Sequence, residues 1–122
     1  MTFRNISFSK EASEALNKLK GKVGLNWNAL SRIGFCLSLN DPVAPDIREP
    51  RSLGDITIDR KTLLGTEEEI YLGLLRQYCV ERNIPQELQK EYFKAHMDRG
   101  VILLSKRVGG LKDLTQLLAT VA

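Results

Sequence analysis

Apolar and polar residues alternate at the start of the chain, where ISFS (residues 6–9) has the pattern of a short strand or an extended arm. Ser9 is then a suitable N-cap for a helix from Lys10 to about Lys20. At about 100° per residue, the apolar side chains of this helix form one stripe, which consists of Ala12, Ala15, Leu16, Leu19 and Val23. Gly21 projects nearly opposite that stripe, so we expect it to end the helix as a C-terminal cap.

A second helix is predicted from Trp27 to about Leu39, with Asn26 as its N-cap. Its inner seam consists of Leu30, Ile33 and Leu37. Phe35 and Leu39 lie off this seam, so the helix is apolar on more than one side. A helix of this kind is either deeply buried or shared with another subunit.

The middle of the chain has the composition of a loop, because residues 40–55 contain three prolines among mixed charges. DITID (residues 55–59) suits a short strand and a continuation of the loop about equally. We therefore expect an acidic, proline-containing loop over about residues 40–60, and its role stays open.

Three further helices are expected in the second half of the chain. Thr66, with Glu69 three residues later, has the spacing of a capping box and predicts a helix start. Pro85 suits the first turn of the next helix, which extends to about Val108 with a weak point at Gly100. The apolar faces consist of Ile70, Leu74 and Tyr78 in the first of these helices, and of Leu111, Leu114, Leu117 and Leu118 in the last, which follows Gly109 and Gly110.

These elements predict a mainly α fold with about five helices, in one domain over residues 1–122, with a possible short N-terminal strand. No apolar run approaches the roughly 20 residues that span a bilayer, and the N-terminus lacks the apolar core of a signal peptide. Only Cys36 and Cys79 could form a disulfide. We therefore expect a cytoplasmic protein with reduced thiols and no membrane contact.

The net charge of +3 is unevenly distributed along the chain. Residues 1–38 contain six bases and two acids, residues 39–69 contain four bases and eight acids, and residues 70–122 contain eight bases and five acids. A basic start, an acidic middle and a basic end can present a positive face without a high net charge. This distribution favours a polyanionic partner mildly over an ordinary solvated surface.

The basic residues of the N-terminal region are the candidate contacts for a phosphate backbone. Lys18 and Lys22 share one flank of the first helix, whereas Lys20 lies on the other. Lysine suits phosphate binding as a flexible point charge, although the same lysines could simply border the apolar stripe and extend into water. The full candidate set is Arg4, Lys10, Lys18, Lys20, Lys22 and Arg32, with Lys106 and Arg107 as a second, weaker set.

Gly21 and Gly24 interrupt a run of good helix formers. They could form a simple turn between two helices, or their bare backbone could allow another subunit to approach closely. These two roles are compatible, and we expect both glycines to lie at an oligomer interface.

The residues offer little for catalysis. His96 is the only histidine and has no companion at metal-ligand spacing. Cys36 and Cys79 lie in apolar helical runs without CxxC spacing, which is typical of buried cysteines. Residues 67–69 are three glutamates, which the helix dipole and the capping box already explain. We expect no catalytic residue, no metal and no cofactor, and therefore no enzyme activity of the chain itself.

The order of ISFS, a helix, a glycine-containing turn and a second helix resembles the start of ribbon-helix-helix DNA-binding proteins, over about a third of the chain. A closer resemblance covers three blocks, residues 6–41, 62–77 and 93–114, which begin ISFSKEAS, TLLGTEEE and FKAHMDRG. In this order and length the blocks resemble the DndE family of DNA sulfur modification proteins.

The resemblance implies a bacterial DNA phosphorothioation system, in which sulfur replaces a non-bridging oxygen of the DNA backbone. It implies a small helical protein, a homo-oligomer and specifically a tetramer, that binds duplex and nicked DNA beside the other subunits of the sulfur modification complex. The family carries no catalytic motif to transfer. Two alternatives stay open: a ribbon-helix-helix transcriptional regulator, and a structural adaptor of the complex that does not bind DNA.

Overall fold

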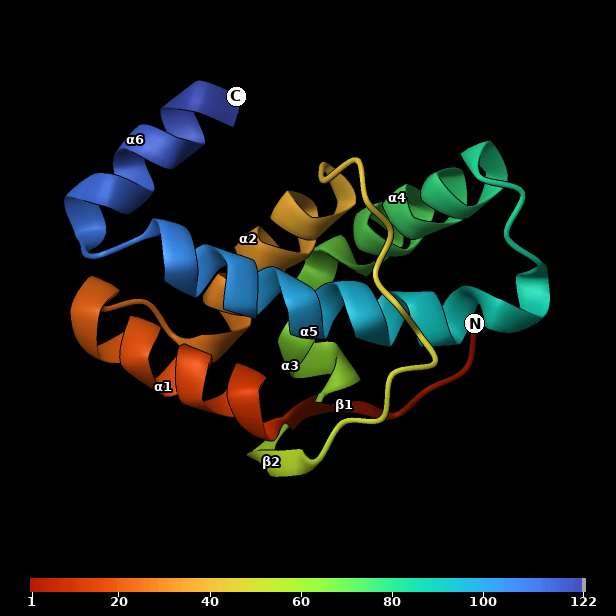
Figure 1. The fold of residues 1–122 in the computed structure, drawn as a ribbon, viewed down its shortest axis with the longest axis horizontal. Helices are drawn as coiled ribbons and strands as arrows, with labels where there is room; N and C mark the ends of the chain where they lie inside the picture. Colours follow the sequence, from red (N-terminus) through yellow and green to blue (C-terminus); the bar gives the residue numbers. More distant parts are fainter. Residues whose placement is uncertain (122) are drawn as a thin grey trace.

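Two long helices, α2 and α5, pack against each other at the centre of the fold (Figure 1). The structure is a computed structural model and describes residues 1–121. The elements are β1 (Asn5–Ser9), α1 (Lys10–Val23), α2 (Trp27–Leu39), β2 (Leu53–Asp59), α3 (Arg60–Leu64), α4 (Glu68–Glu81), α5 (Gln89–Arg107) and α6 (Leu111–Val121), with 3₁₀ turns at Gly65–Glu67 and Gln86–Leu88. The predicted mainly α class is confirmed: five of these helices exceed ten residues, and α3 has five.

The contact between α2 and α5 depends on a pair of glycines. A Cβ atom on Gly34 would lie 2.7 Å from the carbonyl carbon of Gly100, and a Cβ on Gly100 would overlap the backbone of Gly34. The two backbones therefore touch directly. The prediction of a weak point at Gly100 is wrong, because α5 continues through it and uses it as its closest contact with α2. Phe35, which the periodicity placed off the seam, is fully buried beside this contact and packs on Phe93, with their ring centroids 5.0 Å apart.

The two strands form a small antiparallel sheet that covers the start of α1 (Figure 1). Asn5 pairs with Asp59 and Ser7 with Thr57, and an irregularity follows before Ser9 pairs with Leu53. The inner face of the sheet buries Ile6, Phe8, Ile56 and Ile58. The segment DITID is therefore a strand, and β1 pairs with a strand of its own chain.

The first helix is one turn longer than its sequence predicts. The hydroxyl of Ser9 accepts a hydrogen bond from the N–H of Ala12 over 3.1 Å, which confirms the predicted N-cap. At the other end α1 continues through Gly21 to Val23. Gly24 is the C-cap, with a φ of 79° and its N–H donating to the carbonyl of Lys20. The prediction that Gly21 ends the helix is therefore wrong, and the left-handed conformation that favours glycine occurs at Gly24.

The start of α4 differs from the predicted capping box. Residues 65–67 form a 3₁₀ turn, and no side chain caps the helix that begins at Glu68. Glu68 instead pairs with Arg60, whose Nε lies 2.7 Å from the Glu68 carboxylate. The inner side of α4 is also different: Leu72, Leu75, Tyr78 and Cys79 are buried, whereas Ile70 and Leu74 are 57% and 43% exposed.

The acidic loop of residues 40–52 crosses α5 (Figure 1), where two consecutive residues of α5, Asp98 and Arg99, bind it. Arg51 pairs with the buried carboxylate of Asp98, which also accepts hydrogen bonds from the backbone N–H and the hydroxyl of Ser9. Arg99 donates to the carbonyls of Val43 and Ser38. Asp98 and Arg99 thus join the loop, α2 and the start of α1 to α5.

No helix within residues 1–121 is long and apolar enough to cross a membrane.

Candidate nucleic-acid interface

The C-terminal ends of α1 and α5 meet at one end of the molecule. The two helices pack together and run in the same direction, and α6 begins where they end (Figure 1). The sequence contains no acid from residue 15 to residue 40, or from residue 99 to residue 112. This arrangement therefore places two acid-free segments side by side.

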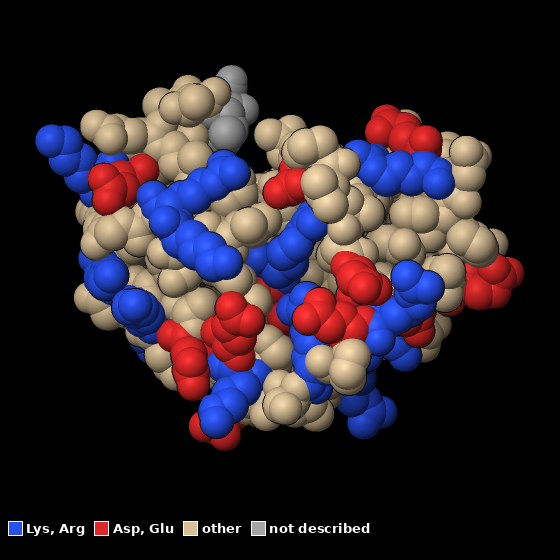
Figure 2. Space-filling view, viewed as in Figure 1, with Lys and Arg blue, Asp and Glu red and all other residues tan. Residues whose placement is uncertain are grey.

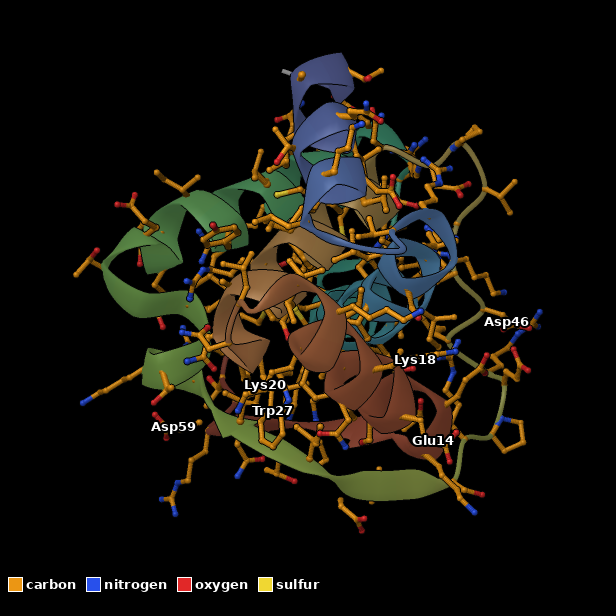
Figure 3. The ribbon with its side chains drawn as sticks, turned by 90° about the vertical axis from the view of Figure 1, so that its left-hand side faces the viewer. Glu14, Lys18, Lys20, Trp27, Asp46 and Asp59 are labelled. Atoms are coloured by element: carbon orange, nitrogen blue, oxygen red, sulfur yellow. The ribbon has the colours of Figure 1, made fainter. Side chains whose placement is uncertain are left out.

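Exposed bases gather at this end. Lys18 lies on the side of α1 that faces α5 (Figure 3), and Lys22, one turn later, lies on the same flank. Figure 2 shows Lys and Arg side chains over α1 and over the end of α5, at the left of the view. We refer to this surface as the basic end, and it consists of Lys18, Lys22, Lys106, Arg107 and Lys112, all exposed. The sequence treated Lys106 and Arg107 as a separate, weaker set, because nothing local indicates that α1 and α5 run side by side.

The other predicted DNA contacts lie apart from the basic end. Lys20 is on the opposite flank of α1, where its ammonium lies 5.1 Å from the ring centroid of Trp27 (Figure 3). Arg32 is half-buried and donates to the carbonyl of Leu63 over 2.7 Å, which anchors α2 to α3. Arg4 precedes β1, and Lys10 lies at the opposite end of α1 from Lys22; both are exposed. The six predicted residues therefore do not form one cluster.

The two glycines of the first turn have different surroundings. Gly24 has a local reason to be glycine, because its φ is positive. Gly21 has none: it lies inside α1 on the exposed face, and a Cβ there would meet nothing within 4 Å. A glycine inside a helix costs roughly 0.5–1 kcal/mol relative to alanine. Within residues 1–121, no packing contact at this position requires a glycine.

His96 of α5 is fully buried, where it contacts α2 and α4. Its Nδ1 lies 2.8 Å from the hydroxyl oxygen of Ser38, and its ring packs edge-on against Tyr78, with the centroids 4.3 Å apart. Burial, together with the positive charges of Arg99 and Arg82, lowers the pKa of His96 to about 3. The ring is therefore neutral near pH 7, as in a structural histidine.

The two cysteines differ from each other. Cys79 is buried as predicted, whereas Cys36 is exposed and lines a hollow between α2, α4 and α6, so the prediction of burial is wrong for Cys36. The walls of this hollow desolvate the thiol and raise the pKa of Cys36, which disfavours the reactive thiolate. Within residues 1–121, no three His, Cys, Asp or Glu side chains come together as a metal site would require.

Comparisons with known proteins agree on one family. A family model described as "DNA sulphur modification protein DndE" matches residues 5–109. Among solved structures, the chain is similar to DndE from Escherichia coli B7A, involved in DNA phosphorothioation modification, with a TM-score of 0.69 and 24% identity over 85% of this chain and 98% of that chain. It is similar also to a glycine-to-lysine double mutant of DndE involved in DNA phosphorothioation, with a TM-score of 0.66 and 23% identity over 85% of this chain and 99% of that chain. The search of curated proteins gave no match.

Proposed function

The chain belongs to the DndE family of DNA sulphur modification proteins, and from this premise we propose that it is a DNA-binding accessory subunit of the DNA phosphorothioation machinery. It binds duplex DNA, including nicked duplex, as a homotetramer beside the other subunits of the complex in the cytoplasm. It contributes binding and no catalytic group. The neutral, buried His96 and the raised pKa of Cys36 support a role without chemistry of its own.

The basic end is the observation that carries this proposal. Its five exposed bases come from three helices, and the ends of α1 and α5 contribute no acid to this surface, whereas α6 contributes the exposed Asp113 beside Lys112. Each phosphate that such a surface neutralises releases counterions, which makes the affinity depend steeply on salt. Exposed lysines suit backbone phosphates rather than base edges, so we expect little sequence preference.

The oligomer is proposed to use the outward face of α1. Gly21 lies on this face with open space around it. A second chain that packs closely there would explain why a helix interior contains a glycine. It would also place basic ends side by side, since Lys18 and Lys22 border the same face. Assembly and DNA binding would then depend on each other.

The test removes three positive charges from the basic end and compares the effect with that of removing three positive charges elsewhere on the molecule. The variant is Lys18→Ala with Lys22→Ala and Lys106→Ala. It should weaken binding similarly on all sequences, and it should shallow the slope of log affinity against log salt by up to about 0.9 for each lost contact. Mobility shifts on intact, nicked and single-stranded DNA at several salt concentrations provide the measurement.

The matched control is Lys61→Ala with Lys90→Ala and Lys94→Ala, which removes the same charge from α3 and the first half of α5. It should keep the native salt slope. Equal losses in both variants would remove the basic end from the proposal. No binding by the native protein at low salt would favour the structural adaptor. Tight binding to one operator would favour the ribbon-helix-helix regulator, which the pairing of β1 with β2 of the same chain does not support.

A further inference from the structure

The side of α4 that faces away from the core is apolar. Ile70, Leu74 and Val80 are 57%, 43% and 67% exposed, and they are three of the seven large hydrophobic residues exposed within the described part of the chain. The buried residues of α4 lie on its other side, where it packs on α5. With Gly73 and Gln77, the exposed residues have the spacing i, i+3, i+4, i+7 and i+10, which places them on one side of the helix. We refer to this surface as the α4 face, and it consists of Ile70, Gly73, Leu74, Gln77 and Val80.

Gly73 lies in the middle of the α4 face. A Cβ atom there would meet nothing within 4 Å, so no neighbour among residues 1–121 requires a glycine at this position. Elsewhere the chain uses glycines inside helices for close packing, because Gly34 and Gly100 bring α2 and α5 into backbone contact beside the buried Phe35. The α4 face has the same composition, a glycine among large apolar side chains, but it is open to solvent. Such a surface suits the close approach of another helix.

The charges around the α4 face are mainly acidic. Residues 62–81 contain four acids and one base, Arg76. Glu69 lies at the start of the face, is exposed, and forms no ion pair in the described part of the chain. Glu81 lies at the other end and is also exposed, with its carboxylate 3.9 Å from the neighbouring Arg82. Both ends of the apolar surface therefore carry an exposed acid.

This charge pattern selects the kind of partner. In a two-fold contact between two α4 faces, an acidic end would face an acidic end whether the helices ran parallel or antiparallel. Like charges that face each other across an interface oppose association, so a second α4 face is a poor occupant. The same acids repel the phosphates of DNA. A helix of a different protein, with an apolar side and basic residues at its ends, complements both the apolar surface and its charges.

We propose that the α4 face is the docking surface for an amphipathic helix with flanking lysines or arginines, presented by another subunit of the modification complex. The apolar side of that helix packs on Ile70, Leu74 and Val80, and its backbone comes closest at Gly73. That the partner is a subunit of this complex rests on the proposed function. The α4 face is separate from the basic end, because α4 lies at the upper right of Figure 1, whereas the basic end lies at the left of the same view. DNA and the partner subunit can therefore bind at the same time.

The experiment measures the binding of each of the other purified subunits of the complex to this chain. Leu74→Lys places a positive charge in the apolar surface, and Gly73→Leu fills the point of closest approach. Each variant should weaken the binding of one and the same subunit by at least about tenfold. Leu111→Lys is the matched control, because it makes the same change at an exposed leucine of α6, and it should keep the native affinity.

The acids provide a second arm of the experiment. Glu69→Lys with Glu81→Lys should weaken the binding of the same subunit. The native affinity should fall as the salt concentration rises, because salt screens the attraction between opposite charges, whereas the affinity of this variant should not fall. Glu87→Lys with Glu91→Lys makes an equal charge change outside α4, at two other exposed glutamates. This control should keep the native affinity and its salt dependence.

Circular dichroism should show every variant folded, and light scattering should give the native mass for each variant alone. Unchanged affinity in Leu74→Lys and Gly73→Leu would overturn the proposal, and so would the failure of every other subunit to bind the native chain. A reduced mass of these two variants on their own would assign the α4 face to a contact between copies and would overturn it as well. If the native chain bound another subunit through this face but bound no DNA, only the proposed function would fail.

Discussion

The contact between α2 and α5 and the outward face of α1 both place a glycine inside a helix, and they do so for different reasons. At Gly100 a side chain would overlap the backbone of Gly34, so packing within the chain explains the glycine. At Gly21 a side chain would meet nothing within 4 Å, so the chain alone gives no explanation. The same residue type therefore reports internal packing at Gly100, whereas at Gly21, as at Gly73 of α4, no contact within the described residues accounts for it.

The largest expected effect is at the contact between α2 and α5. Gly100→Ala forces two backbones apart, so we expect a loss of about 3 kcal/mol or more in the free energy of unfolding. Gly73→Ala is the control, because Gly73 lies inside α4 with nothing within 4 Å of a Cβ, and it should be neutral or slightly stabilising. Urea unfolding measures both. If Gly100→Ala were as stable as Gly73→Ala, the contact between α2 and α5 would not require a glycine, and the contrast between Gly100 and Gly21 would fail.

The buried histidine of the same region gives the next effect, as a dependence on pH. The folded state holds the pKa of His96 near 3, whereas the unfolded chain has its ordinary value of 6.5. Between pH 6.5 and pH 3, His96 is therefore protonated in the unfolded state and neutral in the folded state. The free energy of unfolding is consequently highest above pH 6.5 and decreases as the pH falls toward 3. The expected slope is about 1.4 kcal/mol per pH unit. His96→Phe should lose this part of the slope between pH 6 and pH 4, and parallel curves would contradict the assignment.

The smallest effect on stability distinguishes the two glycines of α1 and its cap. Gly24→Ala should cost about 1 kcal/mol because its φ is positive, whereas Gly21→Ala should stabilise the fold by about 0.5–1 kcal/mol because alanine is favoured inside a helix. Gly21→Lys should likewise fold normally. We expect it nevertheless to halve the mass of the assembly and to weaken DNA binding despite its added charge. A folded Gly21→Lys protein of native mass would leave Gly21 without a role in assembly.

The parts of the fold that the sequence predicts correctly are those fixed by neighbours along the chain. Ser9 and Asn26 cap α1 and α2 through N–H groups three residues away, so both helix starts are correct. The capping box of Thr66 and Glu69 is wrong because Thr66 lies inside a 3₁₀ turn rather than at the N-cap of α4, and α3 is too short to show a period. The exposure of Ile70 and Cys36 also depends on which helices face α4 and α2, and periodicity alone does not contain that information.

The candidate site shows the same limit. Periodicity correctly placed Lys18 and Lys20 on different flanks of α1. It could not join them to Lys106 and Arg107, because more than eighty positions of sequence separate the two sets and only the parallel packing of α1 on α5 brings them together. Arg32 was included on charge alone, and its bond to the carbonyl of Leu63 shows a structural use that its sequence context does not reveal.

The pairing of Gly34 with Gly100 also determines when the protein can fold. The two glycines are 66 residues apart along the chain, so α2 gains its main packing partner only after most of the chain exists. A ribosome adds roughly 5–20 residues per second. For several seconds during synthesis, therefore, Phe35 and the rest of the apolar surface of α2 have no α5 against which to pack. Folding of this chain therefore depends on one long-range closure, the packing of α2 on α5.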